Sequence, residues 1–196
     1  FMTKNPIAFG FGLYAITMFL FFVVYYFFAG PDYFNISINV NAFGLTFIYS
    51  LMGFLSVYYL RKNIGEITYP QAFKQIFITL FVGGFLSFMS IFLFLNYVDT
   101  DARDMLNHQH IESELTKLDE SYNKQIKEIN PKDTEKIKSL NDEYKKMSIG
   151  INGAKKQNIN YFSFSFLSAI FGGVLLFYLL LSIVIAGFLK NKKRYE

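Results

Sequence analysis

Charged side chains are missing from four long segments of this chain, and this absence is its most informative feature. None of the four contains Lys, Arg, Asp, Glu or His; they are residues 7–28, 40–60, 76–98 and 161–189. A bilayer core about 30 Å thick requires about 20 residues of helix to cross it. Each segment is long enough, so the sequence predicts an all-α protein built on a four-helix transmembrane bundle.

The chain also lacks cysteine and tryptophan. Without cysteine there is no disulfide and no thiolate metal site. The aromatic residues are instead 25 Phe and 14 Tyr. Phe is acceptable against lipid, and several Tyr stand near the ends of the segments, where amphipathic rings favour the headgroup level. We therefore interpret the aromatic residues mainly as lipid-facing and interfacial side chains.

Charge is concentrated between the third and fourth segments. Residues 99–160 contain 11 of the 19 Lys and Arg and 12 of the 15 Asp and Glu. This composition divides the chain into three parts. Residues 1–98 would form spans 1–3, residues 99–160 a periplasmic helical hairpin, and residues 161–196 span 4 with a basic cytosolic tail.

The short basic segments predict the orientation. Lys4 precedes the first span, Arg61, Lys62 and Lys74 flank the second loop, and the first loop, residues 29–39, has neither Lys nor Arg. Cytoplasmic loops of membrane proteins carry an excess of Lys and Arg. We therefore expect both termini in the cytoplasm, membrane lipids as partners, and no nucleic acid. The C-terminal tail adds four more basic residues to the side that we predict to be cytoplasmic: Lys190, Lys192, Lys193 and Arg194.

Apolar residues in the insertion recur every three or four positions, the spacing of one helix face. This spacing predicts an extramembrane antiparallel helical hairpin between spans 3 and 4. Asn130 would be the N-cap and Pro131 the first turn of the second arm, and arms of 20–25 residues would project about 30–35 Å. The seam residues would pair with each other or bind a partner chain; they are Leu115, Leu118, Tyr122, Leu140, Tyr144 and Met147.

The two junctions of the insertion differ. No Gly or Pro occurs from Phe85 to Asn130, so the sequence predicts that span 3 continues into the first arm as one helix. The competing interpretation is that Asp99, Thr100 and Asp101 cap a new helix. On the return, Gly150, Gly153 and the polar run at 155–160 predict a break before span 4.

Small residues four apart let membrane helices approach closely. Three such pairs predict helix packing: Gly83 with Ser87, Ser168 with Gly172, and Ala169 with Gly173. Gly10, Gly12, Gly44 and Gly53 could act in the same way.

Groups able to perform chemistry are scarce. Ion-coupled transporters keep carboxylates or His at membrane depth, and the four segments have none. His108 and His110 are two residues apart and do not share a helix face, whereas His108 and Glu112 do. We interpret these three as solvated residues and expect no metal, no cofactor and no catalytic residue, hence no enzyme.

The second loop is the most distinctive short motif. Gly65 suits a turn, and Thr68 can cap the following helix. The loop residues that we single out as a cytosolic feature are Arg61, Lys62, Gly65, Thr68 and Tyr69.

Three motifs resemble a bacterial family of four-span membrane proteins classed as domain of unknown function 4199. They are Asn5-Pro6 before a Gly-rich span, the Gly-Glu-Ile-Thr-Tyr-Pro-Gln-Ala-Phe loop at 65–73, and Val98-Asp99-Thr100 after span 3, where the family usually has Pro in place of Thr100. The resemblance covers nearly the whole chain. It implies a Gram-negative inner-membrane protein with four spans and brings no established activity.

Two functions remain open. The favoured hypothesis is a non-enzymatic accessory or interaction subunit of a membrane complex, whose hairpin or lipid-embedded faces bind another membrane or periplasmic protein, or a second copy. The alternative is a lipid- or polyprenyl-handling accessory or carrier with an uncharged, hydroxyl-lined groove. The resemblance suggests that such a carrier is associated with a membrane glycosyltransferase.

Overall fold

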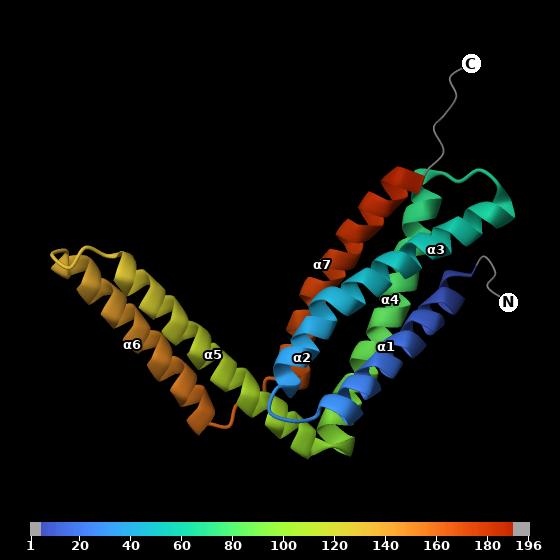
Figure 1. Ribbon diagram of the computed structural model, residues 1–196. Helices are drawn as coiled ribbons and strands as arrows, with labels where there is room; N and C mark the ends of the chain where they lie inside the picture. The colour runs from blue at the N-terminus through green and yellow to red at the C-terminus, as the bar shows by residue number, and fades with distance from the viewer. Residues whose placement is uncertain (1–4, 190–196) are drawn as a thin grey trace.

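The computed structural model describes residues 5–189 (Figure 1). As the sequence predicts, the described part of the chain is helical and contains no strand. Lys4 and the basic tail, on which the predicted orientation partly rests, lie outside the described residues. The helices are α1 (Pro6–Phe28), α2 (Tyr33–Asn39), η1 (Val40–Leu45), α3 (Thr46–Ile64), α4 (Tyr69–Leu93), η2 (Phe94–Val98), α5 (Thr100–Glu128), α6 (Thr134–Lys156) and α7 (Phe164–Leu189).

Four helices are long and apolar enough to cross a membrane. They are α1, the continuous helix Tyr33–Ile64 formed by α2, η1 and α3, the continuous helix Tyr69–Val98 formed by α4 and η2, and α7. Within residues 5–189, the four predicted apolar segments are therefore confirmed as helices long enough to cross a membrane. The prediction of a loop at 29–39 is wrong over most of its length, because the second helix begins at Tyr33. Tyr33 is 1% exposed in a contact with other helices, and this burial extends the helix beyond the apolar segment.

Local signals set several helix ends. The Asn5 Oδ1 atom accepts a hydrogen bond of 2.9 Å from the Ile7 amide at the start of α1. Thr68 is the N-cap of α4, as predicted, and Gln71 Oε1 accepts hydrogen bonds from its amide at 2.9 Å and its hydroxyl at 3.0 Å. Gly65 ends α3 with φ of +82°, a backbone region that side chains beyond glycine rarely adopt. The predicted turn at Gly65 is thus confirmed.

The α4 helix is the centre of the bundle and packs against α1, α3 and α7. Glycine on each side of the α1–α4 contact allows the close approach. A Cβ atom on Gly83 would lie 2.7 Å from the Leu13 side chain, and one on Gly10 would lie 2.7 Å from Val82 Cβ. Each glycine therefore makes room for a side chain of the opposite helix.

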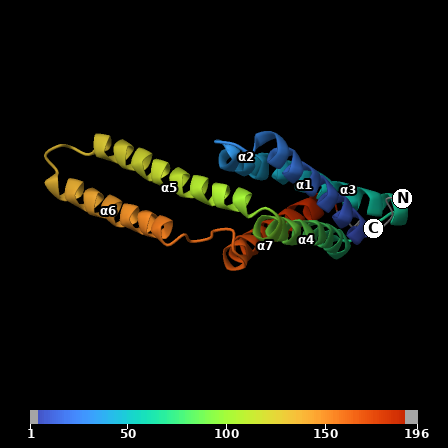
Figure 2. The same ribbon diagram turned by 90° about the horizontal axis from the view of Figure 1, so that it is seen from below.

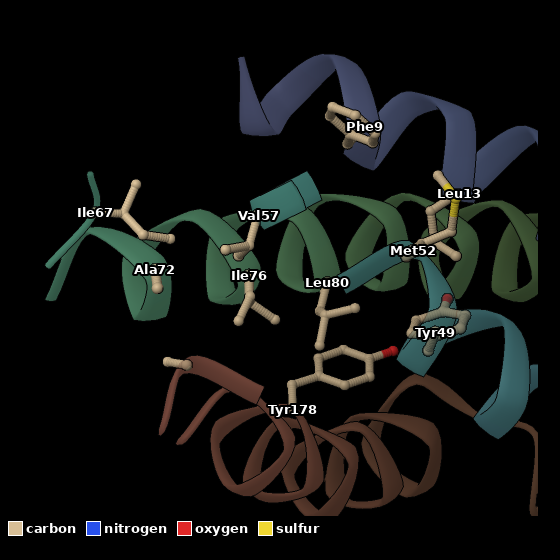
Figure 3. Packing of buried hydrophobic residues seen from close by; sticks show 11 residues of the cluster. Phe9, Leu13, Tyr49, Met52, Val57, Ile67, Ala72, Ile76, Leu80 and Tyr178 are labelled. Atoms are coloured by element: carbon tan, nitrogen blue, oxygen red, sulfur yellow. The ribbon is translucent and has the colours of Figure 1, made fainter. Parts of the chain in front are cut away.

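The half of the bundle nearest the α3–α4 loop holds the main hydrophobic core (Figure 3). We call it the loop end. Its buried residues come from all four spans and from the loop itself, where Ile67 is 2% exposed. They are Phe9, Leu13, Tyr49, Met52, Val57, Ile67, Ala72, Ile76, Leu80, Tyr178 and Ala186.

The opposite half, which we call the hairpin end, is packed by a smaller cluster in which α5 participates. This cluster comprises Val24, Tyr33, Leu95, Ala102 and Leu106. Both π-helical segments, η1 and η2, also lie here. The Asp99 amide donates to the Phe94 carbonyl at 2.9 Å, a bond to the fifth preceding residue that widens the helix. Such segments are rare and are frequent at functional sites.

The helix breaks at Asp99, so the prediction of one helix through span 3 and the first arm is wrong. The Asp99 backbone has φ of −133° and ψ of 86°, and its Oδ1 atom accepts a hydrogen bond of 2.9 Å from the Ala102 amide. The Tyr25 hydroxyl donates to the other carboxylate oxygen. The competing N-cap signal therefore prevails, because a second helix also binds the capping side chain.

The α5 and α6 helices lie side by side and antiparallel, and they leave the bundle sideways (Figures 1 and 2). The antiparallel pairing of the arms agrees with the predicted hairpin, for which the sequence predicted no direction relative to the bundle. The predicted N-cap is wrong: Asp133 caps α6 by accepting from the Lys136 amide, while Asn130 accepts from the Lys132 amide in the preceding turn. Asp133 is the N-cap because its carboxylate reaches the free amides of the first turn of α6.

The break before α7 begins later than predicted. Gly150 and Gly153 lie inside α6, which continues to Lys156. The chain is non-helical at 157–163, which includes the second half of the polar run at 155–160. Glycine lowers helix stability by only about 1 kcal/mol, a cost that packing of α6 against α5 can offset.

Candidate functional site: an apolar groove at the hairpin end

A cavity of about 620 Å³ lies at the hairpin end of the bundle. Its walls come from all four spans. Two further residues border it, Leu106 of α5 and Phe162 of the α6–α7 connector. The volume lies within the range of about 300–1,000 Å³ that is usual for ligand pockets. The residues contributed by the four spans include Thr17, Leu20, Phe21, Val24, Tyr33, Ser37, Ile38, Asn41, Ala42, Phe88, Ile91, Leu95, Ile170 and Val174.

The cavity opens sideways between η1 and α7. Ile38 at the end of α2 is 41% exposed and Ile170 of α7 is 62% exposed, although both line the cavity. Asn41 and Ala42 of η1 are exposed as well. These residues surround a lateral mouth within the apolar segments, where the medium around a membrane protein is hydrocarbon.

A second cavity of about 250 Å³ continues from the first toward the middle of the bundle. The two share lining residues such as Thr17, Asn41 and Phe88, and the second reaches Tyr49 and Tyr178. The rings of these two tyrosines stack with centroids 5.3 Å apart and close the inner end. We call the two connected cavities the apolar groove.

Two polar side chains of the apolar groove already make hydrogen bonds to the backbone. The Thr17 hydroxyl donates to the Leu13 carbonyl at 2.9 Å, and the Asn41 amide donates to the Ser37 carbonyl at 2.7 Å. No lining residue carries a charge. The surface therefore suits a hydrocarbon chain and offers no acid–base pair for chemistry.

Amide side chains of α5 fasten the connectors over the hairpin end. Gln109 Oε1 accepts from the Phe34 amide and Gln109 Nε2 donates to the Gly30 carbonyl, both at 2.8 Å. Asn107 Nδ2 donates to the Ile159 carbonyl at 2.7 Å. Two different faces of α5 thus bind the connectors, Gln109 the α1–α2 connector and Asn107 the α6–α7 connector.

Asn96 makes the corresponding bonds from η2. Its Nδ2 atom donates to the Phe162 carbonyl at 2.9 Å, and its Oδ1 atom accepts from Asn160 Nδ2 at 3.2 Å. Together, Asn96, Asn107 and Gln109 form what we call the amide collar. Our sequence interpretation missed the amide collar. The available signal was one amide, Asn96, near the end of an otherwise apolar segment.

His110 lies within the amide collar between the two connectors. Its ring centroid is 5.2 Å from that of Phe34 and 4.7 Å from that of Tyr161. Its Nδ1 atom is buried and has no hydrogen-bond partner among the described residues. Burial lowers the pKa of His110 below its ordinary value, against a smaller opposing effect of Glu114. The neutral imidazole is therefore the form that fits this site.

Asp99 stands beside the amide collar as an ionised cap. The hydrogen bond from the Tyr25 hydroxyl is the main cause that lowers the pKa of Asp99, and the bond from the Ala102 amide adds to it. His108 and Glu112 are 3.5 Å apart on an exposed helix face. The described residues contain no group of three or more side chains able to hold a metal ion.

Of the predicted seam residues, Tyr122 and Tyr144 meet inside the hairpin, and all but one of the six are at least half-buried. The rings of Tyr122 and Tyr144 lie 4.6 Å apart, and their hydroxyls donate at 2.7 Å to Asn141 and Asp119 respectively. The bond to Asp119 raises the pKa of Tyr144. Leu140 is buried, and Leu115 and Leu118 are half-buried on the same face of α5 as Tyr122.

Met147 is the exception, because its side chain is 47% exposed. Its prediction as a seam residue is therefore corrected.

The predicted small-residue pairs divide into two groups. Gly83 and the buried Ser87 lie on α4, where Gly83 contacts Leu13. On α7, Gly172 and Gly173 have no neighbouring atom within 4 Å of a would-be Cβ. Ala169 is exposed and Ser168 is half-buried. The prediction of helix packing through the α7 pairs is thus wrong within this chain, because α7 turns its larger residues toward α4.

The residues of the loop that we predict to be cytosolic lie at the loop end, far from the apolar groove (Figure 1). Arg61 and Lys62 are exposed in the last turn of α3, while Tyr69 is half-buried at the start of α4. The structure therefore does not bring these residues to the seam or to the groove.

These features define a helical multi-pass membrane protein. The chain belongs to the family described as Protein of unknown function (DUF4199), whose model matches residues 8–191. The family resemblance read from the sequence is thus confirmed. Comparison with curated proteins and with solved structures gives no match.

Proposed function

We propose that this protein binds the hydrocarbon chain of a lipid in the apolar groove and acts as a non-enzymatic lipid-handling component of the inner membrane. The observation that carries the proposal is the cavity of about 620 Å³ with an uncharged lining and a lateral mouth at Ile38 and Ile170. A lipid chain can enter such a mouth without leaving the hydrocarbon layer. Entry from water would instead cross the amide collar.

The chemistry of the lining supports binding of a chain rather than catalysis. The hydroxyl of Thr17 and the amide of Asn41 already make hydrogen bonds to backbone carbonyls. Water in the bilayer core is scarce, so an apolar cavity open to lipid is filled by hydrocarbon. The ligand class is therefore a long apolar chain, either acyl or isoprenoid.

Photo-crosslinking tests this proposal. Protein in lipid nanodiscs receives either a diazirine-bearing acyl phospholipid or a farnesyl-type isoprenoid phosphate, and crosslinked peptides are identified by mass spectrometry. We expect adducts on groove residues, reduced several-fold by Ala42→Phe, which places a ring in the mouth. Ala169→Phe is the matched control, because Ala169 is exposed on α7 outside the groove.

Equal labelling of wild type and Ala42→Phe, spread over all four spans, would indicate surrounding lipid alone and would refute the proposal. The stronger of the two probes identifies the chain. Preferential labelling by the isoprenoid probe supports the association with polyprenyl carriers and a membrane glycosyltransferase.

The orientation belongs to the same proposal. The ends of the described chain and the α3–α4 loop lie at one end of the bundle, with the hairpin at the other (Figure 1). Arg61, Lys62 and Lys74 are exposed at the loop end, which supports a cytoplasmic loop end and a periplasmic hairpin. An impermeant thiol reagent should label Cys at position 121 but not at 63 or 193. The reverse pattern overturns this orientation.

A second function, an accessory subunit of a membrane complex, is favoured by the open face of α7. Gly172 and Gly173 have no neighbour within 4 Å, so a helix of another membrane protein could approach them closely. The test is co-purification from a mild detergent. We expect a stoichiometric membrane protein that is lost with Gly173→Leu and retained with Gly187→Leu, since Gly187 is equally open. Recovery of the bare monomer in every case would refute this function.

A further inference from the structure

The hairpin lies across the end of the bundle rather than in line with it. In Figure 1, α5 and α6 extend to the side of the bundle from the point where η2 ends, and Figure 2 shows the two helices side by side. The turn in direction occurs at Asp99, the cap of α5. Just before it, Tyr97 and Val98 are 74% and 72% exposed at the end of an apolar helix. The α5 helix therefore starts at the level where the bilayer meets water.

Two opposite faces of α5 have different neighbours. Ala102 and Leu106 pack on the end of the bundle, and Gln109 binds the α1–α2 connector. The α6-facing residues include Ile111, which is buried, and Tyr122, which contacts Tyr144. At 100° per residue these two sets lie on opposite sides of the helix. The α5 helix thus lies between the end of the bundle and α6. We call the face of α5 that points toward the bundle its membrane-side face.

The membrane-side face continues beyond the bundle as a polar stripe. Counting on from Gln109 in steps of three and four gives Ser113, Lys117, Glu120, Lys124 and Lys127. This stripe contains all three lysines of α5 and no apolar residue. The lysines and Glu120 are exposed. A face of this kind suits contact with headgroups and not insertion among acyl chains.

The charge of the stripe is positive. Lys117 is 3.2 Å from Glu114, outside the stripe, whereas Lys124 and Lys127 make no ion pair with any described residue. Glu120 is the one acidic residue within the stripe, and Glu128 lies at its edge. Because the spans place a bilayer directly beneath α5, phosphate groups of lipids are the nearest available counter-charges.

We propose that the Lys117–Lys124–Lys127 face of α5 rests on the headgroups of anionic phospholipids in the leaflet on the hairpin side. The contact is electrostatic and holds the hairpin parallel to the membrane surface. Lysines near an anionic leaflet are attracted to it, and added salt weakens the attraction. This inference is independent of what the apolar groove binds.

The chain contains no cysteine, so single labels can be placed without background. A fluorophore is attached to Thr116→Cys, beside the stripe on α5, or to Ser139→Cys on the face of α6 away from α5; both sites are exposed. The full-length protein is placed in nanodiscs of phosphatidylcholine with or without phosphatidylglycerol, and a headgroup spin-label lipid serves as the quencher.

We expect quenching at position 116 to exceed that at 139 several-fold, to increase with phosphatidylglycerol and to decrease with salt. The triple change Lys117→Glu, Lys124→Glu, Lys127→Glu should abolish the increase. A control triple on α6, Lys138→Glu, Lys145→Glu, Lys146→Glu, should leave it unchanged. Far-ultraviolet circular dichroism checks that both triples keep their helical content, and a Lys→Gln triple on α5 should give an intermediate increase.

Two results would overturn the proposal. Quenching at position 116 that responds to neither phosphatidylglycerol nor the α5 triple would show that the lysines do not bind headgroups. Accessibility of position 116 to aqueous iodide, with no quenching by the lipid probe, would show an open face suited to a protein partner instead.

Discussion

The two ends of the transmembrane bundle are built differently from the same helices. At the loop end, Gly10 and Gly83 let α1 and α4 approach closely, and side chains such as Ile76 and Leu80 are fully buried. At the hairpin end, both π-helical segments occur beside an open groove, and the amide collar holds the connectors. Dense packing orders one end, while hydrogen bonds from side chains to the backbone order the other and leave space between the helices.

This difference separates the tightly packed half of the bundle from the half for which we propose lipid binding. Membrane helices associate through close packing, because lipid offers no hydrophobic driving force between them. The loop end supplies that packing. The hairpin end can therefore stay open to a lipid chain without endangering the fold, and the following variants test this division.

The largest expected effect is overpacking at the loop end. Gly83→Leu places a side chain where Leu13 already lies and should destabilise the bundle by about 3 kcal/mol. Unfolding in mild detergent, followed by circular dichroism, measures the loss. Gly173→Leu on the open side of α7 is the control and should change stability by less than about 0.5 kcal/mol. Equal losses at both positions would contradict the division.

Removal of the α5 cap should have the next largest effect. Asp99→Ala removes the hydrogen bonds that Asp99 accepts from the Ala102 amide and from the Tyr25 hydroxyl. This loss should lower the free energy of unfolding by about 1–2 kcal/mol. Limited proteolysis should then cut near the junction. The Asp101 side chain makes no capping bond, so the Asp101→Ala variant should be cut as slowly as wild type. Because the pKa of Asp99 is lowered in the folded state, its contribution to stability is fully present above the unfolded pKa of about 3.9. That contribution is lost as the pH falls through the lower pKa of the folded state.

Acidification should loosen the hairpin end through His110. Its pKa is lowered by burial, so the folded state prefers the neutral ring, and stability falls as pH decreases below the unfolded value of about 6.5. The slope cannot exceed about 1.4 kcal/mol per pH unit for one proton. Melting temperatures between about pH 7.5 and 5.5 should drop for wild type and for His108→Gln, but less for His110→Gln. The same drop in all three would assign it to other groups.

The smallest expected effect is added volume in the groove. Ala42→Phe should change the free energy of unfolding by less than about 0.5 kcal/mol, because the ring enters open space rather than a packed contact. Circular dichroism under the conditions used for Gly83→Leu makes the comparison direct. A loss as large as that of Gly83→Leu would mean that the hairpin end is as tightly packed as the loop end.

Sequence reasoning reached the features that depend on local chemistry. The four spans follow from the absence of charge over lengths that match a bilayer. The turn at Gly65 and the cap at Thr68 follow from the backbone preference of glycine and the hydrogen-bonding capacity of threonine. An uncharged groove was an alternative for the same reason, since no charged residue was available to line it.

The start of α2 at Tyr33, the direction of α5 and the amide collar needed the tertiary structure. Gln109 binds Gly30 and Phe34 across more than 70 positions of sequence, and no local pattern indicates that pairing. Asp99 could continue a helix or cap a new one, and the contact with Tyr25 selects the cap. The sequence by itself thus determined how many helices are long and apolar enough to cross a membrane, because hydropathy and length are properties of each segment. Only the tertiary structure decided where the bundle is closed and where it is open, because that depends on which side chains meet.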